Sequence, residues 1–170
     1  MHTFKEISPA EIQGNPFDLI GKEWMLITAG DGADCNTMTA SWGGVGIMWG
    51  LPVATAYIRP QRHTKLFVDE QDYFTLSFLP EAQCANLAYC GRVSGRDEDK
   101  IARCGFTVET ADCGAPYFAE AELVLVCRKL YRQSMTPDCF VDGSLDGKWY
   151  PQKDYHDMYI AEIVEAYQNA

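Results

Sequence analysis

Short strand-like segments recur along the whole chain, and they constrain the fold more than any other feature. The segment Tyr73–Phe78 alternates apolar and polar residues with a period of two, which is the pattern of a half-buried strand. Further strands are predicted at residues 23–28, 37–42, 53–58, 120–134 and 158–166. The last of these also suits a helix on propensity, but its β-branched residues favour a strand. So many strands predict a mainly β fold that closes, or nearly closes, into a barrel, because closure removes exposed edges.

Helices are predicted between the strands, at residues 62–69, 80–89 and 97–103, with short helical turns at 9–12 and 16–20. The 97–103 helix has the clearest boundaries, since acids precede it, arginine occupies its last turn and Gly105 follows its end. Three glycines, Gly43, Gly44 and Gly46, are predicted to end or bend the second strand. The chain is therefore expected to be β with inserted helices.

Length and composition predict one domain over residues 1–170. The apolar share of 47% and the charged share of 22% are typical of a globular chain. The net charge of −10 argues against nucleic acid, because such binding depends on lysines and arginines that neutralise phosphates. No segment approaches the roughly 20 apolar residues that span a bilayer, and Met1–Glu6 lacks the apolar run of a signal peptide. We expect a cytoplasmic protein without membrane or nucleic-acid partners.

The seven cysteines do not form a recognisable metal or disulfide pattern. Their number is odd and the chain has no Cys-x-x-Cys pair. Zinc sites need closely spaced ligand pairs, and disulfide scaffolds occur mostly in short secreted chains. Free thiols and no metal site are therefore expected, with a redox role for Cys35 as the second interpretation.

Two segments on either side of the 53–58 strand carry the residues best suited to chemistry. The first is small and polar with an aromatic end, and comprises Asn36, Thr37, Met38, Thr39, Ala40, Ser41 and Trp42. The second is cationic and comprises Arg59, Arg62, His63, Thr64 and Lys65. Guanidinium groups hold a phosphate in two-pronged fashion, and a helix start favours anions. Small polar groups, an aromatic wall and a cationic cluster suit a planar cofactor that carries a phosphate, and FMN is the natural candidate.

Each segment also has a purely structural interpretation. The alternative for the cationic cluster is the solvated face of a helix. Trp42 suits a core position, and Asn36 suits a turn. The functional interpretation gains weight only from the order of the two segments along the chain.

Other segments extend this order, at residues 73–77, 94–100, 123–127 and 155–163. In order and spacing, the chain resembles the flavin reductase-like family of FMN-binding split barrels, which includes flavoredoxins. The resemblance covers nearly the whole chain, although no single motif in it is decisive. It implies a six-stranded antiparallel split barrel of the Greek-key type, non-covalently bound FMN and a homodimer with the flavin near the subunit interface.

The resemblance also implies roles for particular residues. By position, residues 36–42 would line the flavin ring and ribityl chain, and Arg59 to Thr64 would hold the phosphate, with Ser94 and Lys100 as further candidates at that end. His156 corresponds to a family histidine close to the flavin, where a nicotinamide docks. From the residues alone, a surface or hydrogen-bonded structural histidine is the favoured interpretation.

This chain departs from the family pattern at two places. Many relatives have glycine where Ala161 stands, and Trp49-Gly50 is expected to lengthen the loop before Pro52 and to narrow access for a nucleotide.

Three functions are consistent with these features. The leading hypothesis is an enzyme, an NAD(P)H-dependent flavin reductase-like oxidoreductase that passes electrons from NADH or NADPH through FMN to an acceptor. The alternative is a flavoredoxin-type electron carrier that serves a redox partner protein, which an acidic surface would favour. A third hypothesis is a hydrolase that uses Cys127 or Cys139 with His156.

Overall fold

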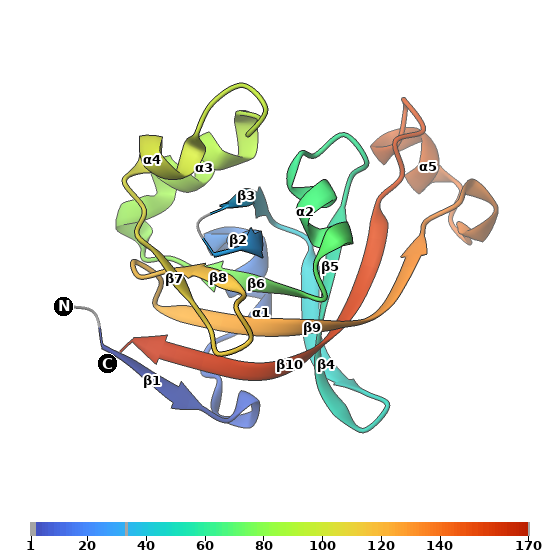
Figure 1. Ribbon diagram of the computed structural model, residues 1–170. Helices are drawn as coiled ribbons and strands as arrows, with labels where there is room; N and C mark the ends of the chain where they lie inside the picture. Colours follow the sequence, from blue (N-terminus) through green and yellow to red (C-terminus); the bar gives the residue numbers. More distant parts are fainter. Residues whose placement is uncertain (1–2, 33, 170) are drawn as a thin grey trace.

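A computed structural model describes residues 3–32 and 34–169 (Figure 1). Within these residues the strands are β1 (Phe4–Ile7), β2 (Met25–Asp31), β3 (Asp34–Ala40), β4 (Gly43–Met48), β5 (Leu51–Ile58), β6 (Tyr73–Phe78), β7 (Val108–Thr110), β8 (Pro116–Phe118), β9 (Leu123–Ser134) and β10 (Asp157–Asn169). The α-helices are α1 (Pro16–Asp18), α2 (Thr64–Glu70), α3 (Cys84–Arg92), α4 (Lys100–Cys104) and α5 (Ser144–Trp149). Helical turns of the 3-10 type lie at Pro9–Glu11, Glu81–Gln83 and Pro137–Cys139, and one of the π type lies at Leu19–Glu23.

One antiparallel sheet of eight strands dominates the structure. Its order is β3-β2-β6-β9-β10-β5-β4, with β1 also paired to β10, and β7 and β8 form a separate pair. The two outer strands of this order, β3 and β4, are consecutive in the chain and are joined only by Ser41 and Trp42. Three peptide units span about 10 Å at most, so the sheet must curl until its edges approach each other at this corner.

The predicted mainly β fold with inserted helices is confirmed, and the split-barrel-like architecture fits. The sheet has eight strands rather than the six that the resemblance implied. No ladder pairs β3 with β4 in the described chain, so the barrel is not closed.

The concave side of the curled sheet holds the main core. Buried side chains from both halves of the sheet meet there, including Met25, Ile58, Phe74 and Tyr159. Gly43 lies in close contact with other parts of the sheet, because a Cβ on it would lie 2.9 Å from both Met25 Cε and the Thr55 carbonyl oxygen. The predicted second strand ends at Ala40, before the three glycines, and Gly43, Gly44 and Gly46 instead belong to a further strand, β4.

The segment Trp49-Gly50 forms a two-residue hairpin turn between β4 and β5. Both residues have positive φ, 53° and 73°, as expected for the tight turns whose twist matches that of paired strands. The expected lengthened loop before Pro52 is therefore absent from this described segment, and Pro52 is already within β5.

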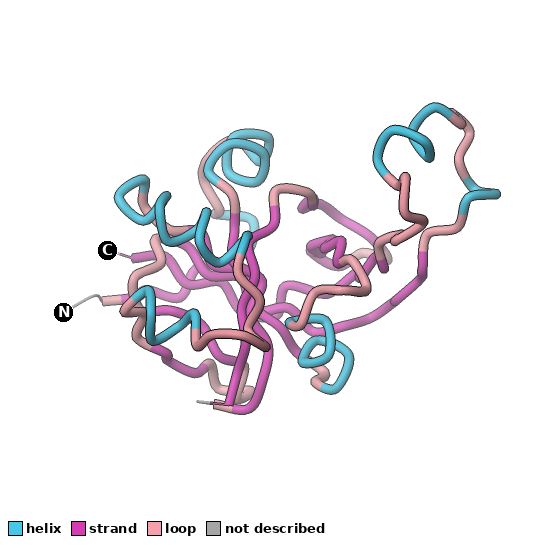
Figure 2. Tube along the Cα trace, turned by 90° about the horizontal axis from the view of Figure 1, so that it is seen from above, coloured by secondary structure: helices cyan, strands magenta, loops and turns pink. Residues whose placement is uncertain are grey.

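The helices lie at the margins of the sheet. In Figure 1, α3 and α4 lie at one end and α5 lies at the other, with α2 between them. The connection between β9 and β10, residues 135–156, carries α5 and extends beyond the sheet; we call it the 135–156 excursion (Figure 2). Among the described residues no helix has the length and apolar character that a membrane crossing requires.

Helix boundaries differ slightly from those predicted. α2 begins at Thr64 rather than residue 62, and α3 begins at Cys84 after a short 3-10 turn. α4 begins at Lys100 rather than Asp97 and ends at Cys104, one residue later than predicted. Gly105 closes it as expected, with a φ of 68° and an N–H that bonds to the carbonyls of the last turn.

A buried ionic cluster attaches α2 to the two longest strands. The Lys65 ammonium lies 2.6 Å from Asp69 and 2.8 Å from Asp157. Arg132 on β9 also donates to Asp157 at 2.7 Å, and the Ser134 hydroxyl donates to the same carboxylate at 2.5 Å. Burial by itself would raise the pKa of Asp157, but these hydrogen bonds outweigh burial and lower the pKa to about 2.

Replacing Asp157 tests this cluster. The pKa of Asp157 is below the roughly 3.9 of an unfolded aspartate, so its carboxylate stabilises the fold above about pH 4 and loses this effect as the pH falls through 2. Asp157→Asn should lower the free energy of unfolding at pH 7 by about 2–3 kcal/mol, measured by urea denaturation. The exposed Asp138→Asn is the matched control. An equal loss in both variants, or a difference that persists at pH 2, would contradict this account.

Candidate functional site

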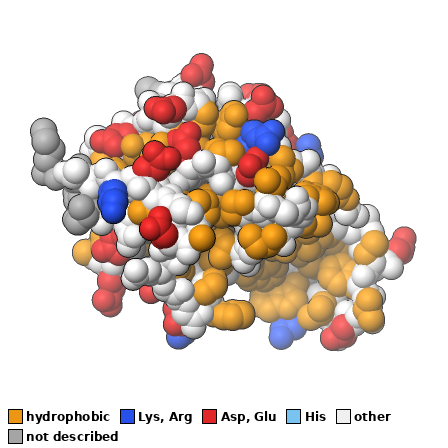
Figure 3. Space-filling view, turned by 90° about the horizontal axis from the view of Figure 1, so that it is seen from below, with side chains coloured by type: hydrophobic (Ala, Val, Ile, Leu, Met, Phe, Trp, Pro, Cys, Tyr) orange, Lys and Arg blue, Asp and Glu red, His pale blue; other side chains and the backbone are white. Residues whose placement is uncertain are grey.

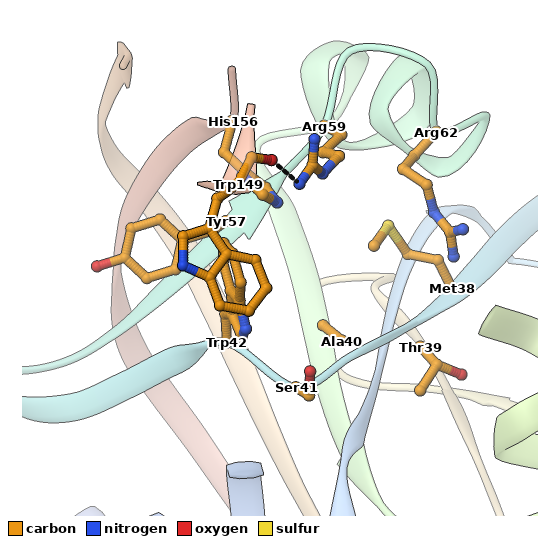
Figure 4. Close-up of a pocket in the computed structure, with 10 residues that line it drawn as sticks. All are labelled: Met38, Thr39, Ala40, Ser41, Trp42, Tyr57, Arg59, Arg62, Trp149 and His156. Atoms are coloured by element: carbon orange, nitrogen blue, oxygen red, sulfur yellow. Dashed lines mark hydrogen bonds between the residues drawn. The ribbon is translucent and has the colours of Figure 1, made fainter. Parts of the chain in front are cut away.

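The corner where the sheet edges meet contains a cavity of about 350 Å³ (Figure 4). Three parts of the chain form it: the end of β3 with its link to β4, the end of β5 with the following turn, and the 135–156 excursion. The lining residues are Met38, Thr39, Ala40, Ser41, Trp42, Tyr57, Arg59, Arg62, Trp149 and His156. Eight of these ten were among the predicted site residues.

The end of β3 forms one side of the cavity. Thr39 Oγ1 donates to the Leu87 carbonyl at 2.5 Å and so holds β3 against α3. Ser41 is exposed, and its hydroxyl has no hydrogen-bond partner among residues 3–32 and 34–169. Ser41 is thus the side chain of this strip that is free to bond to a ligand.

Aromatic side chains form the opposite side. Trp42 is 37% exposed, so it is not the core residue that one interpretation of the sequence suggested. Its ring lies edge-on to Trp149, with centroids 5.1 Å apart, and 5.0 Å from the ring of His156. Figure 4 shows Trp42, Trp149, Tyr57 and His156 grouped on this side, away from Arg62. A flat aromatic ligand would find an apolar surface here.

The two arginines of the cavity have different electrostatic environments. Arg59 forms an ion pair with Asp154 at 2.5 Å and donates to the Trp149 carbonyl at 3.0 Å. Arg62 instead donates to the carbonyls of Gly91, at 2.7 Å, and Cys90, at 3.5 Å. No carboxylate pairs with Arg62 in the described part of the chain, and burial lowers the pKa of its guanidinium. Arg62 therefore carries a partly buried charge that only an added anion would neutralise.

His156 is buried and is held by its neighbour in the excursion. Its Nδ1 lies 2.8 Å from the Tyr150 hydroxyl. Burial, reinforced by the charge of Arg59, lowers the pKa of His156 to about 4. The imidazole is therefore neutral near pH 7 and supplies a hydrogen-bonding group rather than an exchangeable charge.

Three other predicted residues, Asn36, His63 and Lys100, line a second cavity of about 410 Å³. Nδ1 of His63 is buried there without a hydrogen-bond partner among the described residues. A Cβ at Gly95 would collide with the Asn36 amide, so glycine is needed for this close approach. The predicted site residues are thus divided between two cavities.

The remaining predicted residues lie behind or beside these cavities. Thr64 is buried and donates to the Asn36 side chain at 3.4 Å. The Thr37 hydroxyl bonds to that of Thr28 at 2.9 Å, while the Thr37 carbonyl accepts from Lys100 Nζ at 2.5 Å. Burial lowers the pKa of Lys100 to about 8. Ser94 lines neither cavity, and its hydroxyl accepts a hydrogen bond from the Arg96 backbone.

Four residues of the first cavity and its surroundings were not predicted from the sequence: Tyr57, Trp149, Tyr150 and Asp154. Tyr57 lies within a strand pattern that gives no sign of a site. The other three lie in the excursion, where no periodic pattern marks an element, and only the fold brings them to Arg59 and His156.

The hydrolase hypothesis finds no support in this geometry. Cys127 is fully buried in β9, and burial raises the pKa of its thiol. Cys139 is exposed in the excursion, where its sulfur accepts a hydrogen bond from Thr136. No hydrogen bond joins either thiol to His156 in the described chain.

Comparison with known structures shows the same fold in several flavin-related proteins. A flavoredoxin from Methanosarcina acetivorans is 22% identical with a TM-score of 0.67, over 86% of this chain and 68% of that one. An FMN-binding domain of a flavin reductase-like enzyme from Shewanella baltica is 18% identical with a TM-score of 0.69, over 99% and 78% of the two chains. An NADH:FAD oxidoreductase from Streptomyces globisporus is 16% identical with a TM-score of 0.65, over 86% and 75%.

A comparison with curated proteins found no match. A family match provides the decisive evidence, because residues 17–170 match the flavin reductase like domain, which is most of the chain. Together with the curled antiparallel sheet and the cavity at its corner, this match shows that the chain belongs to the flavin reductase-like domain family.

Proposed function

We propose that this protein binds FMN in the first cavity and acts as an oxidoreductase that takes electrons from NADH or NADPH. The observation that carries the proposal is the arrangement of the cavity: an unneutralised guanidinium, Arg62, at one side and the aromatic side chains of Trp42 and Trp149 at the other. A phosphate-bearing flat ligand satisfies both sides at once.

The residues present suit this ligand. Arg62 would bind the phosphate, and the cavity volume of about 350 Å³ lies within the range of small-molecule sites. Residues 38–41 would follow the ribityl chain and the polar edge of the ring, and Trp42 would cover one face. Arg59, already paired with Asp154, would act mainly by holding Trp149 in place. When bound, FMN supplies hydride acceptance and onward electron transfer.

The other predicted residues would act from behind the cavity. Lys100 binds the Thr37 carbonyl and the Cys90 carbonyl, and so connects β3 to the end of α3. Asn36, His63 and Thr64 would support the turn that carries Arg62. Ser94 lies on the neighbouring loop and would approach a phosphate only indirectly.

His156 would orient a nicotinamide beside the flavin without exchanging a proton. The Tyr150 hydroxyl donates most favourably to His156 Nδ1, and this arrangement leaves the other ring nitrogen protonated. A neutral donor of this kind positions a ligand amide, and its charge does not change near pH 7.

A second candidate function is an FMN electron carrier for a protein partner. The net charge of −10 favours it, because an acidic surface steers association with a basic redox protein. Trp42 and Trp149, which contact each other beside the cavity, would restrict entry of a nicotinamide in this case.

We further propose that the protein acts as a homodimer. Exposed apolar side chains gather on the face seen in Figure 3. The β4–β5 hairpin carries four exposed apolar side chains, Val45, Ile47, Met48 and Trp49. Ile47 is 76% exposed, and β4 is an edge strand, which offers unpaired backbone groups to another chain. A second copy would cover this surface.

Removal of the Arg62 guanidinium tests the phosphate site. Arg62→Ala should raise the Kd for FMN about 10- to 100-fold, because a hydrogen bond to a charged group contributes about 1.5–3 kcal/mol. Quenching of flavin fluorescence measures this. Riboflavin lacks the phosphate, so its affinity should be nearly the same in both proteins. The exposed Arg92→Ala is the control, and an equal effect on FMN and riboflavin would refute the role of Arg62.

Anaerobic mixing of the FMN-loaded protein with NADH or NADPH distinguishes the two functions. The enzyme hypothesis predicts rapid loss of the visible flavin absorption, and the carrier hypothesis predicts little loss without a protein partner. Because the pKa of His156 is about 4, its titration should leave no inflection in the reduction rate between about pH 5.5 and 8. His156→Gln retains a neutral donor and should preserve this flat profile.

The dimer proposal has its own test. Light scattering after gel filtration should give twice the 19.1 kDa chain mass for the natural protein and the chain mass for Ile47→Glu. Glu98→Lys, which changes an exposed charge elsewhere, is the control. A monomeric natural protein at micromolar concentration would overturn this part of the proposal.

A further inference from the structure

Two cysteines that come from different helices lie in direct contact. Cys90 lies in α3 and Cys104 is the last residue of α4, and their sulfur atoms are 3.8 Å apart. Cys90 and Cys104 are 14 positions apart in the sequence, so they lack the Cys-x-x-Cys spacing that is typical of a dithiol pair. We propose that this pair is a reversible dithiol–disulfide site, oxidised by a peroxide, that modifies the anchoring of Arg62.

The surroundings of the pair favour bonding between the two thiols. Apolar side chains surround them, including Leu87, Phe106 and Phe118, so neither sulfur has a competing strong partner there. Cys90 is fully buried, whereas Cys104 is partly exposed. A small oxidant therefore reaches Cys104 first, and Cys90 is the only thiol in position to complete the bond among the described residues.

The proposed chemistry proceeds in two balanced steps with hydrogen peroxide. The Cys104 thiolate attacks one peroxide oxygen; an S–O bond forms, the O–O bond breaks and hydroxide leaves, which produces a sulfenic acid. The Cys90 thiolate then attacks the Cys104 sulfur; the S–S bond forms, the S–O bond breaks and the oxygen departs as water. Two thiols lose two electrons and two protons in total, and the peroxide becomes two waters.

Nearby cations assist the second step. Burial is the main cause that raises the pKa of Cys90 to about 12, and the neighbouring Cys104 adds to it. The positive charges of Lys100 and Arg62 favour the Cys90 thiolate and so limit this rise. Attack within the same molecule also needs only a small population of thiolate, because the two sulfurs are already in contact.

Bond formation requires the two sulfur atoms to move closer together. A disulfide has its sulfurs about 2.05 Å apart, so the gap must close by about 1.8 Å. α4 is short, spanning Lys100–Cys104, and ends at Gly105 in the left-handed conformation, which permits a local shift. The sheet need not change.

This shift would reach the first cavity through backbone carbonyls at the end of α3. The Cys90 carbonyl accepts hydrogen bonds from Lys100 and Arg62, and the Gly91 carbonyl accepts one from Arg62. Thr39, which also lines the cavity, donates to the Leu87 carbonyl on the same helix. A shift of the end of α3 therefore moves the Arg62 guanidinium, which the proposed function assigns to the FMN phosphate. The effect on FMN binding thus rests on the proposed function, whereas the disulfide site does not.

Peptide mapping by mass spectrometry tests the bond itself, with or without flavin. Mild treatment of the full-length protein with hydrogen peroxide should cross-link Cys90 to Cys104, and dithiothreitol should reverse it. Closure of a loop of this size should raise Tm by about 6–10 °C. Cys90→Ser and Cys104→Ser should each abolish both effects, whereas Cys84→Ser, an exposed thiol at the start of α3, should retain them.

The second arm compares FMN affinity in the oxidised and reduced protein. At least a threefold change in Kd, absent from both serine variants, is expected. An unchanged Kd overturns the coupling to Arg62, and oxidation to sulfinic acid or cross-linking of other cysteines overturns the disulfide site. If the protein binds no FMN, the proposed function fails, while the peptide map still decides whether the disulfide site exists.

Discussion

The short link between β3 and β4 determines the shape of this molecule. These strands are the outer members of a seven-strand order, yet only Ser41 and Trp42 separate them in the chain. A flat sheet would hold its edges far apart, since neighbouring strands are about 4.8 Å from one another. The link therefore requires a strongly curled sheet, and the glycine at the start of β4 lets the edges approach closely enough for Met25 to pack between them. The cavity lies where the curl leaves the two edges near each other but unpaired.

Electrostatic compensation distinguishes Arg62 from the neighbouring cations in this protein. Lys65 and Arg59 each have a carboxylate within 3 Å, so their charges are balanced inside the fold. Arg62 has only carbonyl partners in the described chain, which satisfy its hydrogen bonds but not its charge. Within residues 59–65, Arg59 and Lys65 thus form ion pairs, whereas the charge of Arg62 is not neutralised by a carboxylate in the described chain. That difference, rather than the density of basic residues, is the stronger argument for an anion site.

Local patterns were sufficient to predict much of the fold. The alternation of Tyr73–Phe78 gave β6 with its observed boundaries, and Gly105 marked the end of α4. β4 escaped prediction because its glycines have low strand propensity, and their need arises from packing against β2. The turn at Trp49 was also hidden, since a bulky residue with positive φ has no sequence signal.

The site was less predictable than the fold because its partners come from distant parts of the chain. Residues 38–42, Arg59, Arg62 and His156, all predicted as site residues, line one cavity. Arg59 and its partner Asp154 are 95 residues apart, and no local pattern could assign that pair. A local sequence pattern also could not show that Asn36, His63 and Lys100 line a second cavity.

The 135–156 excursion separates part of the cavity lining from the main core. It leaves the sheet after β9, supplies Trp149 and His156 to the cavity, and returns directly into β10. Its contribution to the main core is small, because the buried cluster there comes from the strands, α2 and the N-terminal segment. Substitutions of Trp149 would therefore alter the lining of the cavity without removing a side chain from the main core.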